Sequence, residues 1–344
     1  MKISIGKKTD IGCVREANED SLYIDLPPQG ASHGDAPQGG VPQGGTDSAN
    51  RYALLLVADG MGGQVAGKEA SETAVDIIKT LFSDTSKAEK PIEDIRAFIT
   101  ASFRQANKAV FEKGRAKEAE MGTTLTTAFI DDRHAFIGHV GDSRAYHLRA
   151  REIRQVTEDH TLAEDMVRKG RATHEEMQKS PMRSMLTRSI GTKEEVTIDQ
   201  PLGIELEEGD CLLLCTDGLT NLVKEQEILA TVHNTANVQA ACDKLVDMAR
   251  TRGGHDNITV VAAEFGELQR IKGLGIRAKT MAVKSAQTAK ETKKKWFLIA
   301  SIGLLVAVFV FLAYLLVSHY IELDTFNKGP VTEEQAAVEG APSP

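Results

Sequence analysis

The chain has 344 residues, of which 41% are hydrophobic, so it can bury the core of one large domain of roughly 250 residues and still have length to spare. Its four cysteines show neither metal-ligand spacing nor the density of a disulfide framework, which excludes a small stapled scaffold and favours a reducing compartment. Residues 270–295 carry nine Lys/Arg and one Glu, and residues 296–344 carry one Lys and five acidic residues, so an overall charge of −8 leaves −12 on the first 269 residues. Such an acidic domain argues against nucleic acid as a partner and suits a site that collects cations.

The N-terminal segment predicts two short strands joined by a charged junction. Arg15 and the pair Glu19-Asp20 lie at that junction, and Leu22–Ile24 forms the second strand. The segment has no apolar signal-peptide region. Residues 27–50, with six Gly and four Pro, predict a disordered loop inserted between strands, and an inert spacer is favoured over a docking loop.

The stretch Tyr52–Gly63, YALLLVADGMGG, organises the chain. An apolar run of strand length ends in Asp59 and then turns at Gly60, so a carboxylate is placed at a strand tip. The pattern recurs where Cys211–Leu219 delivers Asp217. Asp-Gly is also common turn chemistry, and either copy alone would be read that way.

The remaining elements follow from hydrophobic periodicity. Two helices with period 3.6, predicted to pack side by side over a sheet, cover Gly67–Phe82 and Pro91–Arg115, and a third covers Asn237–Arg250. Further strands are predicted at Leu125–Ile130, Ala135–Val140, Tyr146–Leu148 and Ile258–Phe265. Residues 161–179 are polar and helix-prone, which predicts a small segment outside the core that could act as a lid. Because the order is not strictly βαβ, we expect an α+β domain with largely antiparallel sheets.

Acidic residues recur beside the predicted strand ends. They are Glu19, Asp20, Asp59, Asp142, Asp217 and Asp256. Converging carboxylates cannot all stay ionised unless something neutralises them, and a divalent metal is the usual solution. An all-oxygen set selects Mg²⁺ or Mn²⁺ over Zn²⁺. A pair of such ions can activate a water for hydrolysis of a phosphate ester.

Together these residues carry a resemblance to the metal-dependent protein phosphatases of type 2C, in their bacterial, serine/threonine-specific form. The motifs, in the family's order, are Arg15-(x)3-Glu19-Asp20, Val57-Ala58-Asp59-Gly60-Met61-Gly62-Gly63, Met121-Gly122-Thr123-Thr124, Gly141-Asp142-Ser143-Arg144, Thr216-Asp217-Gly218 and Asp256-Asn257-Ile258-Thr259. The resemblance covers about residues 3–266, and we expect the phosphatase domain over residues 1–266. It implies a central β-sandwich of two antiparallel sheets flanked by helices, with metals at one end and a flap over residues 161–191.

The resemblance also implies roles for individual residues. Asp59 would bridge two Mn²⁺ or Mg²⁺ ions and Asp217 and Asp256 would hold one of them. The Gly60 carbonyl and Glu19 would hold the other, with Asp20 nearby through water. Asp142 would join Asp217 at a third, looser ion. Arg15 would bind phosphate and, with Asp59 and Asp217, serve catalysis; its planar fork suits a phosphate dianion.

One position departs from the animal members of this family. They have a His, proposed as general acid, directly after the bridging Asp-Gly, and here that residue is Met61. Metal-bound water is the first alternative as proton donor. His160 is a lesser candidate, and a structural role is favoured for it.

The C-terminal part predicts a membrane anchor. Residues 296–317 are 22 residues without a charge, about 33 Å as a helix, which matches a bilayer core. The basic linker, 267–295, precedes this transmembrane helix and a short acidic disordered tail, 318–344, follows it. We expect a single-pass protein of the cell membrane. Because the side of a membrane span that is rich in Lys/Arg stays cytoplasmic, the catalytic domain is expected in the cytoplasm and the tail outside the cell.

The sequence therefore predicts a membrane-anchored, metal-dependent serine/threonine phosphoprotein phosphatase. Its expected partners are phosphorylated proteins, including a Ser/Thr protein kinase and its substrates. The alternative is a non-enzymatic phosphoprotein-binding adaptor that retains the fold. Loss of a metal-binding carboxylate would favour the adaptor, and none is missing.

Overall fold

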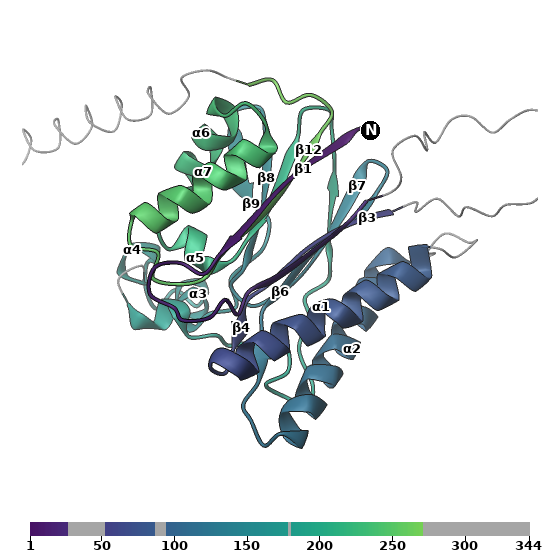
Figure 1. Cartoon of the computed structure of the whole chain (residues 1–344), viewed down its shortest axis with the longest axis vertical. Helices are drawn as coiled ribbons and strands as arrows, with labels where there is room; N and C mark the ends of the chain where they lie inside the picture. The colour runs from purple at the N-terminus through teal and green to yellow at the C-terminus, as the bar shows by residue number, and fades with distance from the viewer. Residues whose placement is uncertain (27–51, 87–93, 178–179, 271–344) are drawn as a thin grey trace, which may run out of the picture. The chain divides into compact units, whose positions relative to one another are not determined.

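The computed structural model describes residues 1–26, 52–86, 94–177 and 180–270, which belong to one compact unit, Met1–Gly275. Two antiparallel five-stranded sheets form its centre (Figure 1). In spatial order the first sheet contains β1 (Ile3–Asp10), β12 (Ile258–Phe265), β11 (Cys211–Cys215), β8 (Arg144–Arg149) and β9 (Glu152–Gln155). The second contains β10 (Leu202–Glu205), β7 (His134–Val140), β6 (Leu125–Asp131), β3 (Tyr52–Ala58) and β2 (Ser21–Asp25).

Helices cover the outer face of each sheet. α1 (Gln64–Ser86) and α2 (Ile95–Ala116) lie side by side over the second sheet, and α6 (Glu225–Asn234) and α7 (Val238–Thr251) lie over the first (Figure 1). The expected α+β sandwich flanked by helices is therefore what the structure shows, and the prediction that the first two helices pack side by side over a sheet is confirmed.

Strand β3 explains why the two sheets stack. Its even-numbered residues Leu54 and Leu56 pack against the α1 and α2 layer, whereas Leu55 and Val57 pack against the other sheet. All four are at most 2% exposed. A strand that is apolar on both faces can lie only between two layers, because each buried Leu or Val contributes about 1.5–3 kcal/mol.

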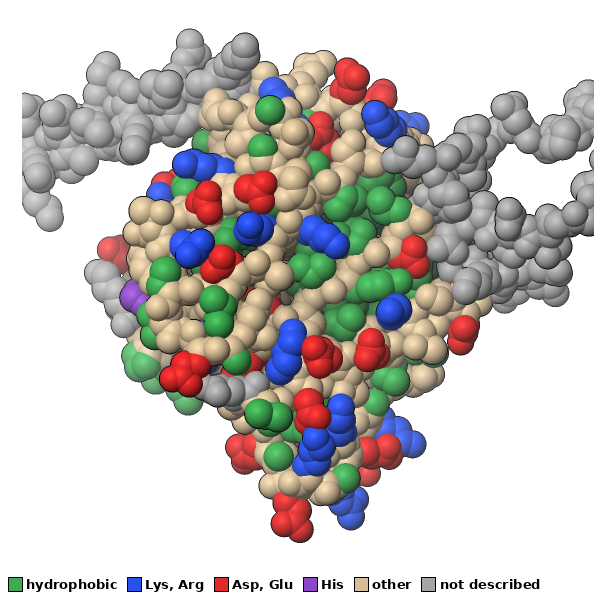
Figure 2. All heavy atoms as spheres, viewed as in Figure 1, with side chains coloured by type: hydrophobic (Ala, Val, Ile, Leu, Met, Phe, Trp, Pro, Cys, Tyr) green, Lys and Arg blue, Asp and Glu red, His purple; other side chains and the backbone are tan. Residues whose placement is uncertain are grey.

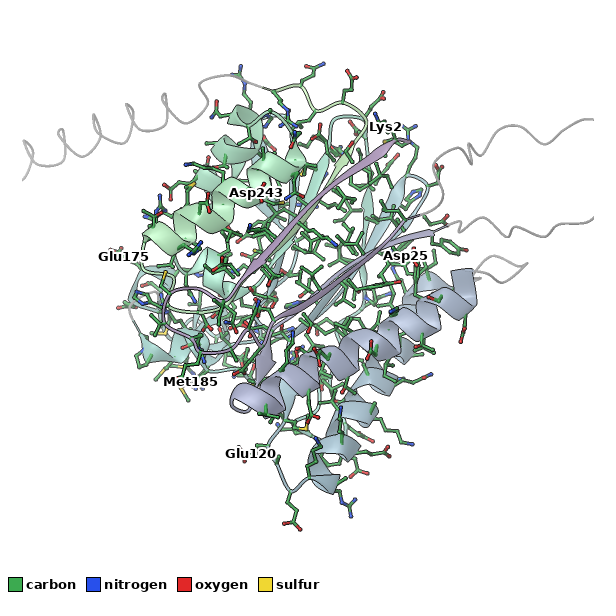
Figure 3. All side chains as sticks on the ribbon, in the orientation of Figure 1. Lys2, Asp25, Glu120, Glu175, Met185 and Asp243 are labelled. Carbon is green, nitrogen blue, oxygen red and sulfur yellow. The ribbon has the colours of Figure 1, made fainter. Side chains whose placement is uncertain are left out.

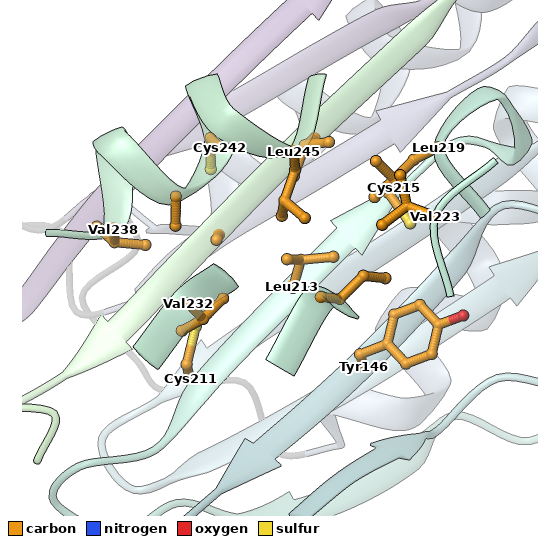
Figure 4. Packing of buried hydrophobic residues seen from close by; sticks show 14 of the residues in the cluster. Tyr146, Cys211, Leu213, Cys215, Leu219, Val223, Val232, Val238, Cys242 and Leu245 are labelled. Atoms are coloured by element: carbon orange, nitrogen blue, oxygen red, sulfur yellow. The ribbon is translucent and has the colours of Figure 1, made fainter. Parts of the chain in front are cut away.

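The first sheet is covered in the same way. Val238, Cys242 and Leu245 of α7 lie over Cys211 and Leu213 of β11 (Figure 4). The three cysteines Cys211, Cys215 and Cys242 are buried and free, and so behave as apolar packing groups. On the described part of the face shown in Figure 2, acidic and basic side chains are interspersed.

Several short elements were not predicted. They are β9, β10, α6 and a single helical turn, α5 (Asp217–Thr220). The segment expected to form the flap, 161–191, contains α3 (Leu162–Arg168), α4 (His174–Met177) and a 3-10 turn, Pro181–Ser184. The helix expected over 91–115 begins at Ile95, because the side chain of Asp94 accepts the hydrogen bond of Ala97 N and caps the helix there.

Parts of the predicted organisation lie outside the described residues. These are the loop 27–50, the linker beyond residue 270, the span 296–317 and the tail 318–344. Within the described ranges, the helices are too short or too polar to cross a bilayer. The domain boundaries themselves stay a prediction.

Candidate active site

One cavity of about 530 Å³ collects most of the acidic residues that the sequence singled out. Its lining includes Arg15, Glu19, Asp59, Gly60, Asp142, Asp217 and Asp256. We call it the acidic cavity. The four aspartates lie beside strand ends: Asp59 follows β3, Asp142 follows β7, Asp217 follows β11 and Asp256 precedes β12. The two sheets therefore deliver these carboxylates to the same end of the sandwich.

The backbone of Asp59 is fixed by two threonines of the neighbouring turn. Asp59 N donates to Thr124 Oγ1 at 2.9 Å, and Thr123 Oγ1 donates to Asp59 O at 2.9 Å. Thr124 Oγ1 in turn lies 2.7 Å from Ser143 Oγ, next to Asp142. The short strands β4 (Gly60–Met61) and β5 (Gly122–Thr123) pair across this turn. These bonds tie the positions of Asp59 and Asp142 to each other.

Asp20 does not line the acidic cavity but lies buried behind it, at 3% exposure. Its Oδ2 accepts hydrogen bonds from Thr216 Oγ1 at 2.9 Å and Thr259 Oγ1 at 2.6 Å. Its Oδ1 is buried without a partner among the described residues. Burial raises the pKa of Asp20 to about 7, and the nearby Asp217 adds to this rise while the two hydroxyls oppose it.

The carboxylates that line the acidic cavity disfavour one another's charge. Burial, and then repulsion from Asp20 and Asp217, raises the pKa of Asp59 well above its usual range. Burial and Asp217 raise the pKa of Asp142 to about 8, and burial and Asp256 raise that of Asp217 to about 6. Groups in this state gain stability from any cation that enters between them.

The donor set fits a hard divalent ion. Asp217 Oδ1 is a second buried oxygen without a partner, while Asp217 Oδ2 accepts from Asn221 Nδ2 at 2.9 Å. Buried polar atoms normally have partners, so Asp217 Oδ1 in the wall of the cavity and Asp20 Oδ1 behind it fit a site that binds a cation. In the described ranges no three His, Cys, Asp or Glu side chains are already arranged as a metal-binding cluster, so the assignment of individual ligands stays a prediction.

The side chain of Glu19 packs closely against Gly67, which in turn packs closely against Gly60. A β-carbon on Gly60 would collide with Gly67 O, and one on Gly67 would collide with Glu19 Oε2. The backbone of Glu19 is held by Asn257, whose Oδ1 accepts from Glu19 N at 2.8 Å. Asn257 Nδ2 also donates to Ala17 O at 2.9 Å. Asn257 thus fixes the N-terminal junction next to Asp256.

Arg15 lies at the mouth of the cavity and is half exposed. Its guanidinium donates to Asp256 Oδ2 at 2.8 Å, and this bond raises the pKa of Arg15 further above neutrality. It is therefore a permanent positive charge beside the carboxylates, positioned to bind an anion that enters the cavity.

The residues considered as proton donors are separated. Met61 lines the acidic cavity. His160 does not: it is 5% exposed, its Nδ1 accepts from Gly141 N at 3.1 Å, and its Nε2 lies 2.9 Å from Asp199 Oδ2. Burial lowers the pKa of His160. These contacts support the structural role that was favoured for this residue.

Some residues at the site were not predicted. Thr216 and Thr259 stood inside quoted motifs without a role, and Asn221 stood outside them. Thr216 and Thr259 meet Asp20 only because β11 and β12 pair beside it. Asn221 carried a usable signal, since it lies one helical turn after Asp217.

This chain is similar in sequence and in fold to known protein phosphatases. The family profile of protein phosphatase 2C matches residues 43–251. The serine/threonine phosphatase stp of Listeria innocua is 32% identical over 265 residues, which cover 76% of this chain and 96% of that protein. The crystal structure of the Mycobacterium tuberculosis serine/threonine phosphatase PstP/Ppp is similar with a TM-score of 0.63 at 32% identity, covering 77% of this chain and 99% of that one. A structure of the PstP catalytic domain in complex with two manganese ions has a TM-score of 0.60 at 31% identity, with coverage of 77% and 99%.

Proposed function

Because this chain belongs to the protein phosphatase 2C family, and is a protein serine/threonine phosphatase with Mn²⁺ or Mg²⁺ as its cofactor, we propose that it hydrolyses phosphoserine and phosphothreonine monoesters in the acidic cavity by means of a metal-activated water. The observation that carries the proposal is the gathering of Asp59, Asp142 and Asp217 in the acidic cavity, where burial and mutual repulsion raise their pKa values and Asp217 Oδ1 is buried without a partner among the described residues.

Particular residues would hold the ions. Asp59 would contact both, Asp217 and Asp256 one of them, and Glu19 with the Gly60 carbonyl the other. Asp20 would act through water, and Asp142 would share a third ion with Asp217. When bound, two such ions supply a low-pKa water and neutralise charge on the phosphate oxygens.

The chain's own groups bind and orient the phosphate. The guanidinium of Arg15, which donates to Asp256 Oδ2, would donate to phosphate oxygens when substrate binds. Its planar arrangement of N–H groups suits a phosphate dianion. Thr123 and Thr124 would keep Asp59 in place during this exchange. Met61 has no proton to give, and in the described ranges no His lines the acidic cavity, so the leaving group takes its proton from water.

The test is hydrolysis by the purified full chain. We expect turnover of p-nitrophenyl phosphate and of a phosphothreonine peptide with Mn²⁺ or Mg²⁺, and none with a chelator. Asp217→Asn should remove the activity, whereas Asp243→Asn, which changes a partly exposed carboxylate on α7 outside the acidic cavity (Figure 3), should keep it. Metal-independent turnover, or an active Asp217→Asn variant, would contradict the proposal.

We also propose that residues 296–317 anchor the chain in the cell membrane with the catalytic domain in the cytoplasm. The support is the charge-free run and the nine basic residues at 270–295 that precede it. Substrates at the membrane, including a Ser/Thr kinase, would follow from that position. A reporter that is active only outside the cytoplasm, fused after Pro344, should be active, and external protease should spare the phosphatase domain. A silent reporter, together with loss of the phosphatase domain to external protease, would show that the orientation is the reverse.

A further inference from the structure

A second cavity, of about 470 Å³, adjoins the acidic cavity. Met61, Gly62 and Thr192 line both, so the two spaces meet along these residues. We call the second space the apolar cavity. Its other walls come from the end of α2 and the turn that follows, and they include Phe111, Ala119 and Met121. A ligand held in one cavity is therefore next to the other.

The apolar cavity is lined by hydrophobic side chains that differ in burial. Met121 is buried at 3% exposure, but Phe111, Ala119 and Met61 are only partly buried. Arg115 and Glu120 supply charged groups to the same lining. Most ligand sites combine apolar walls with a few polar groups in this way. Met61 at the junction is unbranched and flexible, so it can adapt to side chains of different shape.

Three exposed apolar residues lie close in the sequence to residues that line the acidic cavity. Val14 is 62% exposed, Val65 73% and Met185 53%, which makes them three of the few large apolar side chains that stand exposed in the described part of the chain. Val14 precedes Arg15, Val65 follows the Gly62-Gly63 turn, and Met185 lies in the flap. Figure 3 places Met185 and Glu120 toward the end of the sandwich opposite Lys2.

We propose that the apolar cavity is a specificity subsite, which binds a large apolar side chain lying within a few residues of the phosphorylated Ser or Thr of the substrate protein. The inference rests on the proposed function. Its occupant is a phosphoprotein segment because the two cavities are continuous: a chain with its phosphate beside Arg15 passes Met61 and Thr192 and reaches the second space. Arg115 and Glu120 lie where they can contact its backbone or neighbouring side chains.

The first test uses the full chain with Mn²⁺ and a panel of phosphothreonine peptides. In each peptide one position, among the four before and the four after the phosphothreonine, is varied. The varied position carries Leu, Phe or Ser. We expect kcat/KM to rise about tenfold for Leu or Phe over Ser at one position, mainly through KM. A flat panel would overturn the subsite. Turnover of p-nitrophenyl phosphate, which is too small to reach it, reports the acidic cavity alone, so its absence would instead overturn the proposed function.

The second test fills the cavity. Ala119→Phe should erase the preference for Leu or Phe, and Ala116→Phe, three residues earlier and exposed at the end of α2, is the matched control that should retain it. Phe111→Ala removes an apolar wall without adding bulk, and should also weaken the preference if Ala119→Phe does not fold. The inference is overturned if the preference survives in Ala119→Phe with p-nitrophenyl phosphate turnover intact, or survives in Phe111→Ala.

Discussion

The guanidinium of Arg15 donates to Asp256 Oδ2 at 2.8 Å although 241 residues separate them in the chain. The bond joins the proposed phosphate-binding residue to a proposed metal ligand. A phosphate that enters the acidic cavity therefore competes with Asp256 for the same donors. Binding a cation beside Asp256 would weaken its hold on Arg15, so metal and phosphate should favour each other's binding.

Replacing Arg15 should affect substrate binding more than turnover. Arg15→Ala should raise KM by roughly 10- to 100-fold, because a hydrogen bond to a charged group contributes about 1.5–3 kcal/mol, and should lower kcat less. Arg15→Lys should recover part of the loss, because the lysine ammonium keeps the positive charge but cannot make the paired hydrogen bonds of the guanidinium. Steady-state kinetics with a phosphothreonine peptide measure both. A fall in kcat with KM unchanged would mean that Arg15 serves the transition state.

The metal-free protein should become more stable as the pH falls. The pKa values of Asp142, Asp20 and Asp217 are raised to about 8, 7 and 6 in the folded state, so folding takes up protons in this range. The cost of ionising these groups is absent below their ordinary pKa near 4 and grows as the pH rises through 6 to 8. We expect Tm in chelator to rise by several degrees between pH 8.5 and 5.5.

Saturating Mn²⁺ should remove or reverse that trend, because the ions stabilise the ionised carboxylates and compete with protons. Differential scanning calorimetry across this pH range, with and without Mn²⁺, measures both curves. Equal pH dependence in the two conditions would show that cations do not bind among these groups.

Adding one methyl group to Gly67 should weaken the site although no proposed ligand is replaced. In Gly67→Ala the new β-carbon meets Glu19 Oε2, so Glu19 has to move. Helix propensity alone would favour Ala here by about 1 kcal/mol, so the folded domain should persist. We expect Mn²⁺ affinity to fall about tenfold, as for other changes that reposition a ligand.

A metal titration followed by activity measures that loss, and Asp76→Ala, an exposed position on the same helix, provides the comparison. Unchanged Mn²⁺ dependence in Gly67→Ala would show that the position of Glu19 is not critical for the site.

The parts of the fold that could be predicted are those whose side chains repeat with one period. β3, β12 and α7 are buried runs or strong amphipathic patterns, and their predicted bounds lie within a few residues of those observed. β10 was missed because it is an edge strand in which three of four residues are exposed, so only its pairing with β7 defines it. α6 was missed although Ile228, Leu229 and Val232 are buried, because ten residues give too short a pattern.

The candidate site could be predicted as a set of strand-end carboxylates but not as a network. Strand tips meet at one end of a sandwich, so Asp59 and Asp217 were expected to converge, and both line the acidic cavity. The position of Asp20 behind it could not be predicted, because it depends on hydroxyls of Thr216 and Thr259 that lie 196 and 239 residues away. Such long-range partners follow from strand register.

We propose that the acidic cavity holds divalent ions between its carboxylates. Isothermal titration calorimetry of the full chain with Mn²⁺ tests it most directly, with Asp59→Asn measured in parallel. We expect at least two ions per wild-type chain, proton release on binding near neutral pH, and loss of one or both ions in the folded Asp59→Asn variant. A wild-type chain that binds no Mn²⁺, or an Asp59→Asn variant that binds it like the wild type, would contradict the claim.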